Sequence, residues 1–165
     1  MNSTRKLVLT ALLCAVAVAT SSFLFVPVGM IRAFPVQHLI NIVLAVLVGT
    51  KYAVTGAFIV SLLRNLLGLG SLFAFPGSMV GALLAGLVYK KTKSLLWTAV
   101  AEVVGTGVIG AMLCYPIATL ILGREASLFF VMPAFFASSL LGATISFVIL
   151  KVLMPHLGIR QGGRN

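Results

Sequence analysis

Long apolar stretches, separated by short polar or glycine-containing breaks, run along the whole chain. A helix that crosses a bilayer needs about 20 mostly apolar residues, with a range of roughly 17–25. The stretches predict six membrane-spanning helices, which we place at residues 7–25, 39–50, 52–67, 72–89, 95–122 and 128–154. Pro116 predicts a bend or an early end in the fifth span. The pattern therefore predicts an all-α integral membrane protein, a six-transmembrane-helix bundle forming a single membrane domain over residues 1–165.

The division between the second and third spans depends on a short break at residues 49–52, and a five-span interpretation would merge them. Charge decides between the two. Five spans would place the Lys cluster at residues 90–93 outside, against the rule that Lys and Arg gather on the cytoplasmic side. With six spans and the N-terminus inside, nine of the twelve cations are cytoplasmic: Arg5, Lys6, Lys51, Lys90, Lys91, Lys93, Lys151, Arg160 and Arg164. We therefore expect six spans with both termini cytoplasmic.

The N-terminal segment also resembles a secretory signal peptide, because Arg5 and Lys6 precede an apolar run and the small residues 17–19. The apolar run continues past that point, through residues 23–26, and removal of the first span would leave only five. We therefore expect the first span to remain in the protein.

Composition supports the membrane assignment. Hydrophobic residues make up 61% of the 165 residues and charged residues 8%, whereas an ordinary soluble domain carries about 25% charged residues. So few charged residues cannot cover a water-facing surface. The high fraction of apolar residues also argues against a disordered chain. The net charge of +10 does not indicate nucleic acid, because that needs cations clustered on one face or arm. We expect a lipid bilayer as partner and no nucleic acid.

The residue types that carry catalysis are scarce. The two acids are Glu102 and Glu125, and the chain contains no Asp, so no Ser/His/Asp constellation can be assembled. It has no Walker A motif for ATP and no Cys/His cluster with zinc spacing. Cys14 and Cys114 fall inside predicted spans, where free Cys usually packs as a small hydrophobe. We expect no enzyme, no metal and no cofactor; binding and transport are better provided for.

Polar residues are costly at membrane depth and usually face a cavity or the bundle interior. When the direction of each span is followed at 1.5 Å per residue, a group of polar and aromatic residues falls in the outer half of the membrane. Such a mixture is typical of a small-molecule site, and it predicts an outward-facing pocket. The candidate binding residues are Gln37, His38, Asn41, Arg64, Asn65, Phe73, Phe75, Ser78, Tyr115 and Ser139.

Other interpretations of these residues stay open. Arg64 can extend to the outer interface instead of a pocket, and His38 can be an ordinary interfacial histidine. The phenylalanines can face lipid or the core. Glu102 falls about a third of the way into the fifth span from the inside, so we place it apart from the pocket. It is either a proton or cation site or the partner of a cationic side chain.

Ala11, Ala15 and Ala19 lie on one face of the first span, four residues apart. A row of small residues lets another helix backbone approach closely, which is what drives helix association in lipid. The row serves either a partner protein or another helix of the same chain.

Two stretches of the sequence resemble the ThiW family. One is residues 34–41, at the first loop and the start of the second span, and the other is residues 63–86, from the third span into the fourth. The second stretch is long and unusual, and we regard it as specific. The last two spans match mainly in length and hydropathy. ThiW proteins are substrate-binding S components of energy-coupling factor (ECF) vitamin transporters.

The resemblance implies a six-helix bundle in the bacterial cytoplasmic (inner) membrane. It would bind the hydroxyethylthiazole moiety of thiamine from outside, beneath the loop at residues 26–37. It also implies partners, a transmembrane coupling subunit and two ATPase subunits that hydrolyse ATP in place of this chain. S components carry an AxxxA row in helix one that docks on the coupling subunit, and Ala11, Ala15 and Ala19 fit that pattern. On this hypothesis, the ligand takes hydrogen bonds from His38, Asn41, Arg64 and Asn65 and apolar contacts from Phe73, Phe75 and Tyr115.

The chain departs from related thiamine sites, which have acidic and Trp residues near the outer end. Its Trp97 lies near the inner end of the fifth span. This departure fits a neutral thiazole better than cationic thiamine. The alternatives are an S component for thiamine or another small vitamin, a self-sufficient permease coupled to protons through Glu102, and a membrane scaffold that transports nothing.

Overall fold

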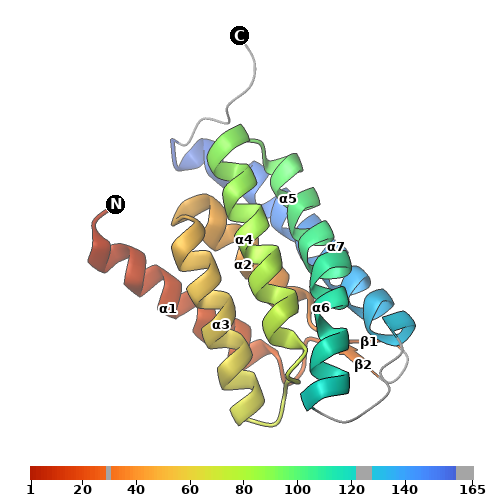
Figure 1. Ribbon diagram of the computed structural model, residues 1–165. Coiled ribbons are helices and arrows are strands. Elements are labelled where there is room, and N and C mark those ends of the chain that lie inside the picture. Colours follow the sequence, from red (N-terminus) through yellow and green to blue (C-terminus); the bar gives the residue numbers. More distant parts are fainter. Residues whose placement is uncertain (29–30, 122–127, 159–165) are drawn as a thin grey trace.

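Helical segments lie at the place of each predicted span in the computed structural model, which describes residues 1–28, 31–121 and 128–158. The helical segments pack side by side as a bundle (Figure 1). They are α1 (Ser3–Thr20), α2 (Pro35–Leu47), α3 (Thr50–Leu66), α4 (Ala74–Thr92), α5 (Leu95–Val104), η1 (Gly105–Gly110), α6 (Ala111–Pro116), η2 (Ile117–Ile121) and α7 (Leu128–His156). We refer to the four consecutive segments from α5 to η2 as the fifth helix.

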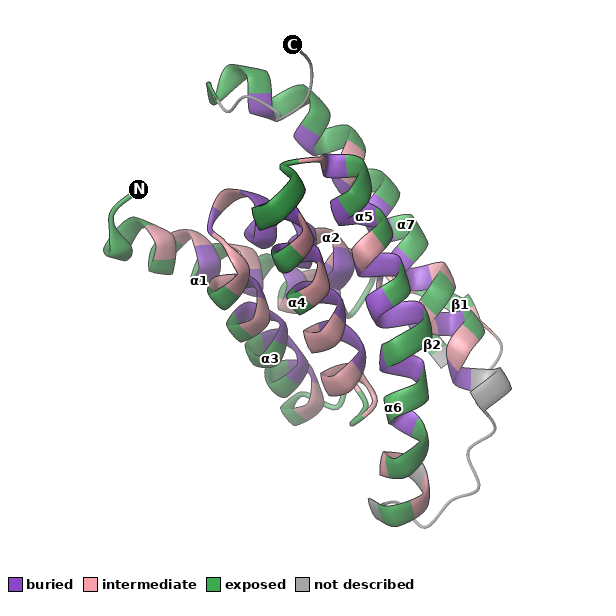
Figure 2. Ribbon diagram, turned by 45° about the horizontal axis from the view of Figure 1, so that its top comes forward, coloured by how far each residue is buried: buried purple, intermediate pink, exposed green. Residues whose placement is uncertain are grey.

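The outward faces of these helices are apolar. Figure 2 shows exposed residues along the outer faces and buried residues turned inward, and the exposed set includes many Leu, Val and Ile side chains. A helix of a soluble bundle would carry polar residues there. By length and composition, three helices among the described residues are able to cross a membrane, Ser3–Thr20, Leu95–Pro116 and Val131–His156, and α2 is a shorter apolar helix. The fold is therefore that of an all-helical membrane protein.

Several helix boundaries differ from the predicted spans, and two of these differences have a clear local reason. α2 begins at Pro35 rather than residue 39, because the fixed φ of proline suits the first turn of a helix. α1 ends at Thr20 rather than residue 25, where the hydroxyls of Thr20, Ser21 and Ser22 hydrogen-bond to the last backbone carbonyls. The chain then turns between α2 and α3 at Gly49, whose φ of 113° is accessible mainly to glycine.

A short β-hairpin occupies the segment for which the sequence predicted only a loop. β1 (Val26–Val28) pairs antiparallel with β2 (Ile31–Ala33), so that Val26 lies opposite Ala33. Strands of three residues leave no alternating pattern long enough to recognise. β2 packs against α7. The start of α1 and the end of α7 lie toward the other end of the bundle (Figure 1).

The sequence predicted a bend or an early end of the fifth helix at Pro116, and the early end is wrong. The helix continues as the π-helical η2, and a second π-helical segment, η1, lies ahead of α6. Proline lacks a backbone N–H, and a π-turn gives the chain another way to pair the freed carbonyls. η1 begins three residues after Glu102, a residue that belongs to the site described below.

Glycines let α4 and the fifth helix touch backbone to backbone. A Cβ added at Gly105 would lie 2.9 Å from the Cα of Gly81, and one at Gly110 would lie 2.6 Å from the Cα of Gly77. Gly86 of α4 makes a similar contact with Thr50 at the start of α3. Small residues that allow close approach are the usual basis of helix packing in lipid. These glycines therefore serve packing within the chain.

Both cysteines are buried and free, as their position in apolar spans predicted. The Cys14 thiol lies 3.7 Å from the carbonyl oxygen of Gly56 on α3, and the Cys114 thiol lies 3.2 Å from the carbonyl oxygen of Gly110 in its own helix. Each therefore fills space in the core with a weak S–H donor satisfied by a backbone carbonyl.

Gly110→Ala is expected to destabilise the protein, although alanine is the better helix former. The new Cβ would overlap the α4 backbone at Gly77, and overpacking of this kind costs about 1–3 kcal/mol. The measurement is the midpoint of thermal unfolding in detergent. Val108→Ala, on the exposed side of the same π segment, is the control and should change the midpoint little. A Gly110→Ala midpoint equal to or above that of the wild type would contradict this packing.

Candidate ligand-binding site

A cavity of about 460 Å³ opens at the hairpin end of the bundle. Its lining comes from β2, the first turn of α2, the end of α3 and the connection that follows, the start of α4, η1 and α7. A few polar groups among apolar and aromatic side chains are typical of a small-molecule site. The polar lining residues are Arg32, Gln37, His38, Arg64, Ser71, Ser78, Thr106 and Ser138, and the aromatic ones are Phe34, Phe73 and Phe135.

Half of the candidate binding residues meet at this cavity although they lie on three different helices or their ends. They are Gln37, His38, Arg64, Phe73 and Ser78. The structure thus brings α2, the end of α3 and the start of α4 together at one depth, as the direction of the spans predicted. That these side chains hold a ligand remains a prediction.

Two of the other candidates support the cavity from behind. Asn41 is buried one turn below His38, and its Nδ2 donates to the carbonyl oxygen of Ser78 and to Oε1 of Glu102, at 3.1 Å each. Asn65 donates to one backbone carbonyl of α3 and one in the connection before α4. These amides fix the helices relative to one another without lining the cavity.

The remaining candidates face elsewhere. The ring of Phe75 packs against Phe58 of α3, with 5.6 Å between the ring centroids. Tyr115 is half exposed on α6. Ser139 is buried, but its hydroxyl donates to the carbonyl of Phe135 in its own helix, at 2.8 Å. None of the three side chains lines the cavity.

Arg64 is buried inside the chain and does not extend to the outer interface. The residue as a whole is only 2% exposed. Nη1 donates to Oε1 of Gln37, and Nη2 donates to the carbonyl oxygen of Leu69 at 3.2 Å. The guanidinium carbon lies 3.6 Å from the centroid of the Phe34 ring, a cation–π contact. Arg64 therefore connects α2, the α3–α4 connection and the segment that follows the hairpin.

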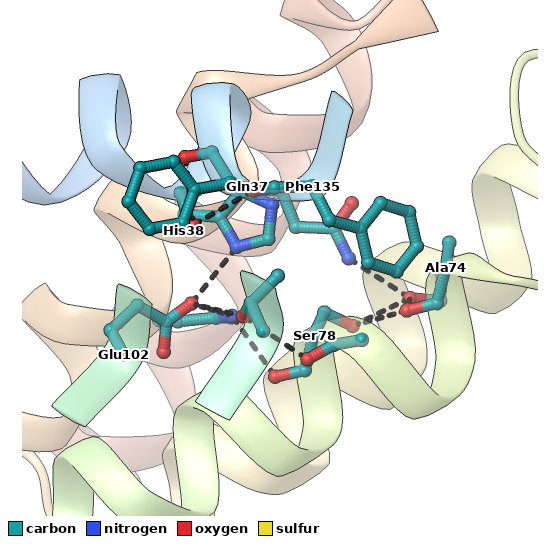
Figure 3. A network of polar contacts seen from close by, with 12 residues as sticks. Gln37, His38, Ala74, Ser78, Glu102 and Phe135 are labelled. Atoms are coloured by element: carbon teal, nitrogen blue, oxygen red, sulfur yellow. Dashed lines mark hydrogen bonds and ion pairs between the residues drawn. The ribbon is translucent and has the colours of Figure 1, made fainter. Parts of the chain in front are cut away.

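Glu102 lies beneath the cavity, which corrects the prediction that it stands apart. Its Oε1 lies 2.9 Å from Nδ1 of His38 and accepts from Asn41 Nδ2 at 3.1 Å and Thr106 Oγ1 at 3.3 Å. Figure 3 shows His38 above the carboxylate, with Phe135 beside it. The depth estimate treated His38 as the outer end of a span. Counted from the opposite end of α2 at Leu47, His38 is nine residues in, about 14 Å, and Glu102 is seven residues from the start of α5 at Leu95, about 10 Å.

The Glu102 carboxylate has no exposed surface. A buried carboxylate is tolerated only when it is hydrogen-bonded or paired, and the three contacts on Oε1 meet that need on one side. Oε2 has no partner among the described residues. It lies against Gly81 of α4, where an added Cβ would be 2.7 Å from it. The missing side chain at Gly81 therefore makes room for the carboxylate.

Several cavity residues were not among the candidates, and one carried a signal in the sequence. Thr106 follows Glu102 by four residues, so both lie on one face of the fifth helix. Ser138 and Ser139 are neighbours that point about 100° apart on a helix, and the sequence does not show which of them faces inward. Phe34 takes its place from the hairpin, for which the sequence had no pattern.

The alanine row of α1 lies on the surface. Ala11, Ala15 and Ala19 are all exposed, and the residues of α1 that are buried are Thr10, Cys14 and Ala17. The sequence allowed two interpretations, contact with a partner protein or packing against another helix of this chain. The exposure of the three alanines within the described residues argues against the second. The row is available to another molecule.

Two comparisons with known proteins, one with family models and one with solved structures, found a match. A family described as thiamine-precursor transporter protein (ThiW) matches residues 7–156. The fold is similar to that of a solved structure described as "Structure and mechanism of the S component of a bacterial ECF transporter", with a TM-score of 0.70. The two share 15% sequence identity, and the similarity covers 95% of this chain and 97% of that chain. Among curated proteins, none matches in sequence. At this identity, the structural similarity shows the fold alone.

Arg64→Lys is expected to lower the free energy of unfolding by about 1–3 kcal/mol. Lysine keeps the charge but has no planar fork to reach Gln37 and the Leu69 carbonyl together, so buried acceptors lose their donor. The measurement is thermal unfolding in detergent. Arg32→Lys, at an exposed position of β2, is the control, and surface changes usually stay within about 0.5 kcal/mol. Equal midpoints for the two variants would show that the Arg64 contacts contribute nothing.

Proposed function

Because this chain belongs to the ThiW family of thiamine-precursor transporter proteins, we propose that it is the S component of an ECF transporter for hydroxyethylthiazole, the thiazole moiety of thiamine. The protein is a membrane transporter protein and not an enzyme. The observation that carries the ligand assignment is a cavity under the hairpin with aromatic lining and a few hydrogen-bonding groups, and with no acidic residue among the described residues that line it.

The charge of the cavity favours the thiazole over thiamine. Its lining contains Arg32 and Arg64, and the nearby Glu102 already has His38, Asn41 and Thr106 around Oε1. A cationic thiazolium ring would bring a third positive charge without a free carboxylate in the lining, at a cost in a medium of low dielectric constant. A neutral thiazole avoids that cost. The cavity volume accommodates either ligand, so charge carries the choice.

The orientation that we propose has six spans, with both termini on the cytoplasmic side of a bacterial cytoplasmic membrane. The start of α1 and the end of α7 lie away from the cavity (Figure 1). Cations gather at the same end of the bundle, among them Lys51 at the start of α3, Lys90 and Lys91 at the end of α4, and Lys151. The positive-inside rule puts that end in the cytoplasm, so the cavity opens outward.

The transport step would belong to partner subunits. The chain has no Walker A motif for ATP, so a pair of ATPase subunits would act through a transmembrane coupling subunit. The exposed row Ala11, Ala15 and Ala19 is the surface that we assign to that subunit, because small residues let a second helix approach closely. The row lies on α1, which contributes no residue to the cavity lining.

The ligand assignment predicts saturable binding of hydroxyethylthiazole to the detergent-purified protein, with thiamine bound at least about tenfold more weakly, a difference of about 1.4 kcal/mol. Isothermal titration calorimetry measures both affinities, and competition between the two ligands checks that they share one site. Thiamine bound more tightly than the thiazole would replace the proposed ligand. Saturable binding of neither would remove the thiamine-precursor assignment for this cavity.

The docking assignment predicts that Ala15→Leu abolishes co-purification with the coupling subunit and leaves thiazole binding intact, because the added side chain keeps a second helix from approaching. Val16→Leu, which adds bulk at an exposed position beside the row, is the matched control and should retain the partner. Loss of ligand binding in Ala15→Leu, or equal retention of the partner by both variants, would count against this surface.

A further inference from the structure

We propose that Glu102 is a positioning residue that sets the direction of the hydrogen bond between His38 and the ligand, so that the cavity selects a free alcohol. This inference rests on the proposed function and adds a rule of selectivity to it. Its elements are a buried carboxylate, an imidazole at the cavity and a serine hydroxyl without a partner.

The first step is the fixed position of the carboxylate. Glu102 has no exposed surface, and Oε1 is in contact with donors from α2 and from η1. The backbone of Gly81 closes the space beside Oε2. A carboxylate held from several sides in this way has one orientation, and the hydrogen bond it makes with an imidazole has one orientation as well.

The second step is the proton of His38. An ionised carboxylate only accepts hydrogen bonds, so the contact of 2.9 Å between Glu102 Oε1 and His38 Nδ1 requires the proton on Nδ1. In the neutral imidazole the other nitrogen, Nε2, is then an acceptor. His38 lines the cavity, and Nε2 makes no hydrogen bond within the described part of the chain. With the imidazole neutral, Nε2 offers a lone pair to whatever occupies the cavity.

The third step is Ser138, which supplies the complementary group. It lines the cavity, is 2% exposed, and its hydroxyl has no partner among the described residues. An unpaired buried hydroxyl is costly, and at the cavity a ligand atom would pair with it. Ser138 lies one helical turn before Gly142, and an added Cβ at Gly142 would be 2.8 Å from the Cβ of His38. The two residues are therefore neighbours across the α2–α7 contact.

Together these groups suit an alcohol of a small heterocycle. The ligand hydroxyl would donate to His38 Nε2 and accept from the Ser138 hydroxyl. An ether at the same place has no proton to donate to Nε2, so it would leave the imidazole acceptor unpaired.

The experiment compares two ligands on the full chain in detergent: hydroxyethylthiazole and its O-methyl ether. Calorimetry is expected to show the ether at least about tenfold weaker than the alcohol, because the lost hydrogen bond leaves a buried acceptor unpaired. An ether within about twofold of the alcohol would overturn the selectivity rule while leaving the thiazole assignment in place. Failure of both ligands to bind would overturn the rule and the assignment together.

Variants separate positioning from folding. In Glu102→Gln the amide can donate to Nδ1, which allows the tautomer with the proton on Nε2, so the preference for alcohol over ether should fall to about twofold or less. A merely structural role would weaken both ligands equally and leave the ratio unchanged, which would overturn the proposal. If this variant does not fold, the comparison of alcohol and ether on the wild type still decides.

Ser138→Ala tests the second group. It should weaken alcohol binding about tenfold. Ser146→Ala is the matched control, because Ser146 is also buried on α7 with an unpartnered hydroxyl but lies two turns further along, outside the cavity lining. The control should bind as the wild type does. Equal affinities for the two serine variants would contradict the proposed hydrogen bond from the Ser138 hydroxyl to the ligand.

Discussion

The close approach of α4 to the fifth helix is the constraint on which the rest of the site depends. Gly77 and Gly81 present bare backbone to Gly110 and Gly105, and the space thus left beside Gly81 receives the Glu102 carboxylate. A larger residue at any of these positions would separate the helices and leave the carboxylate without its surroundings. In lipid, where apolar side chains gain little from leaving the solvent, close packing and hydrogen bonds must hold the helices together, and here both act at one contact.

The two buried charges of the cavity region are of opposite sign but do not touch. A chain of hydrogen bonds joins them: Arg64 donates to Gln37, Gln37 donates to Ser61, and Ser61 pairs with the hydroxyl of Ser78. The carbonyl of Ser78 accepts from Asn41, which also donates to Glu102. Such connected networks are stable when their members are satisfied and costly when they are not. Among the described residues of this region the unsatisfied atoms are Arg64 Nε, Glu102 Oε2 and the Ser138 hydroxyl. Of these residues Arg64 and Ser138 line the cavity, and there a ligand would complete the network.

The apolar pattern along the chain predicts every helix, because runs of about 20 apolar residues have few alternatives in lipid. It also predicts that Gln37, His38 and Arg64 meet at one end of the bundle, since that follows from the direction of each span. It does not predict rotation about a helix axis, which decides whether Ser138 or Ser139 lines the cavity, or the level of His38 relative to Glu102. Both depend on contacts with other helices. The hairpin was also missed, because its strands of three residues depend on α7 rather than on their own pattern.

The distribution of burial separates the proposed ligand site from the proposed docking surface. Of the 18 residues of α1, only Thr10, Cys14 and Ala17 are buried, and α1 packs mainly against α3. The cavity is lined instead from β2, α2, the end of α3, α4, η1 and α7. α2 and α3 both contact α1 and line the cavity. α3 makes the larger contact, since Gly56 meets Cys14 of α1 and Arg64 on the same helix reaches the cavity. Gly56 and Arg64 are eight residues apart on α3, about two helical turns or 12 Å at 1.5 Å per residue. If occupancy of the cavity changes what the partner encounters on α1, α3 is the direct route, since it already holds Arg64 at one end and α1 along its side.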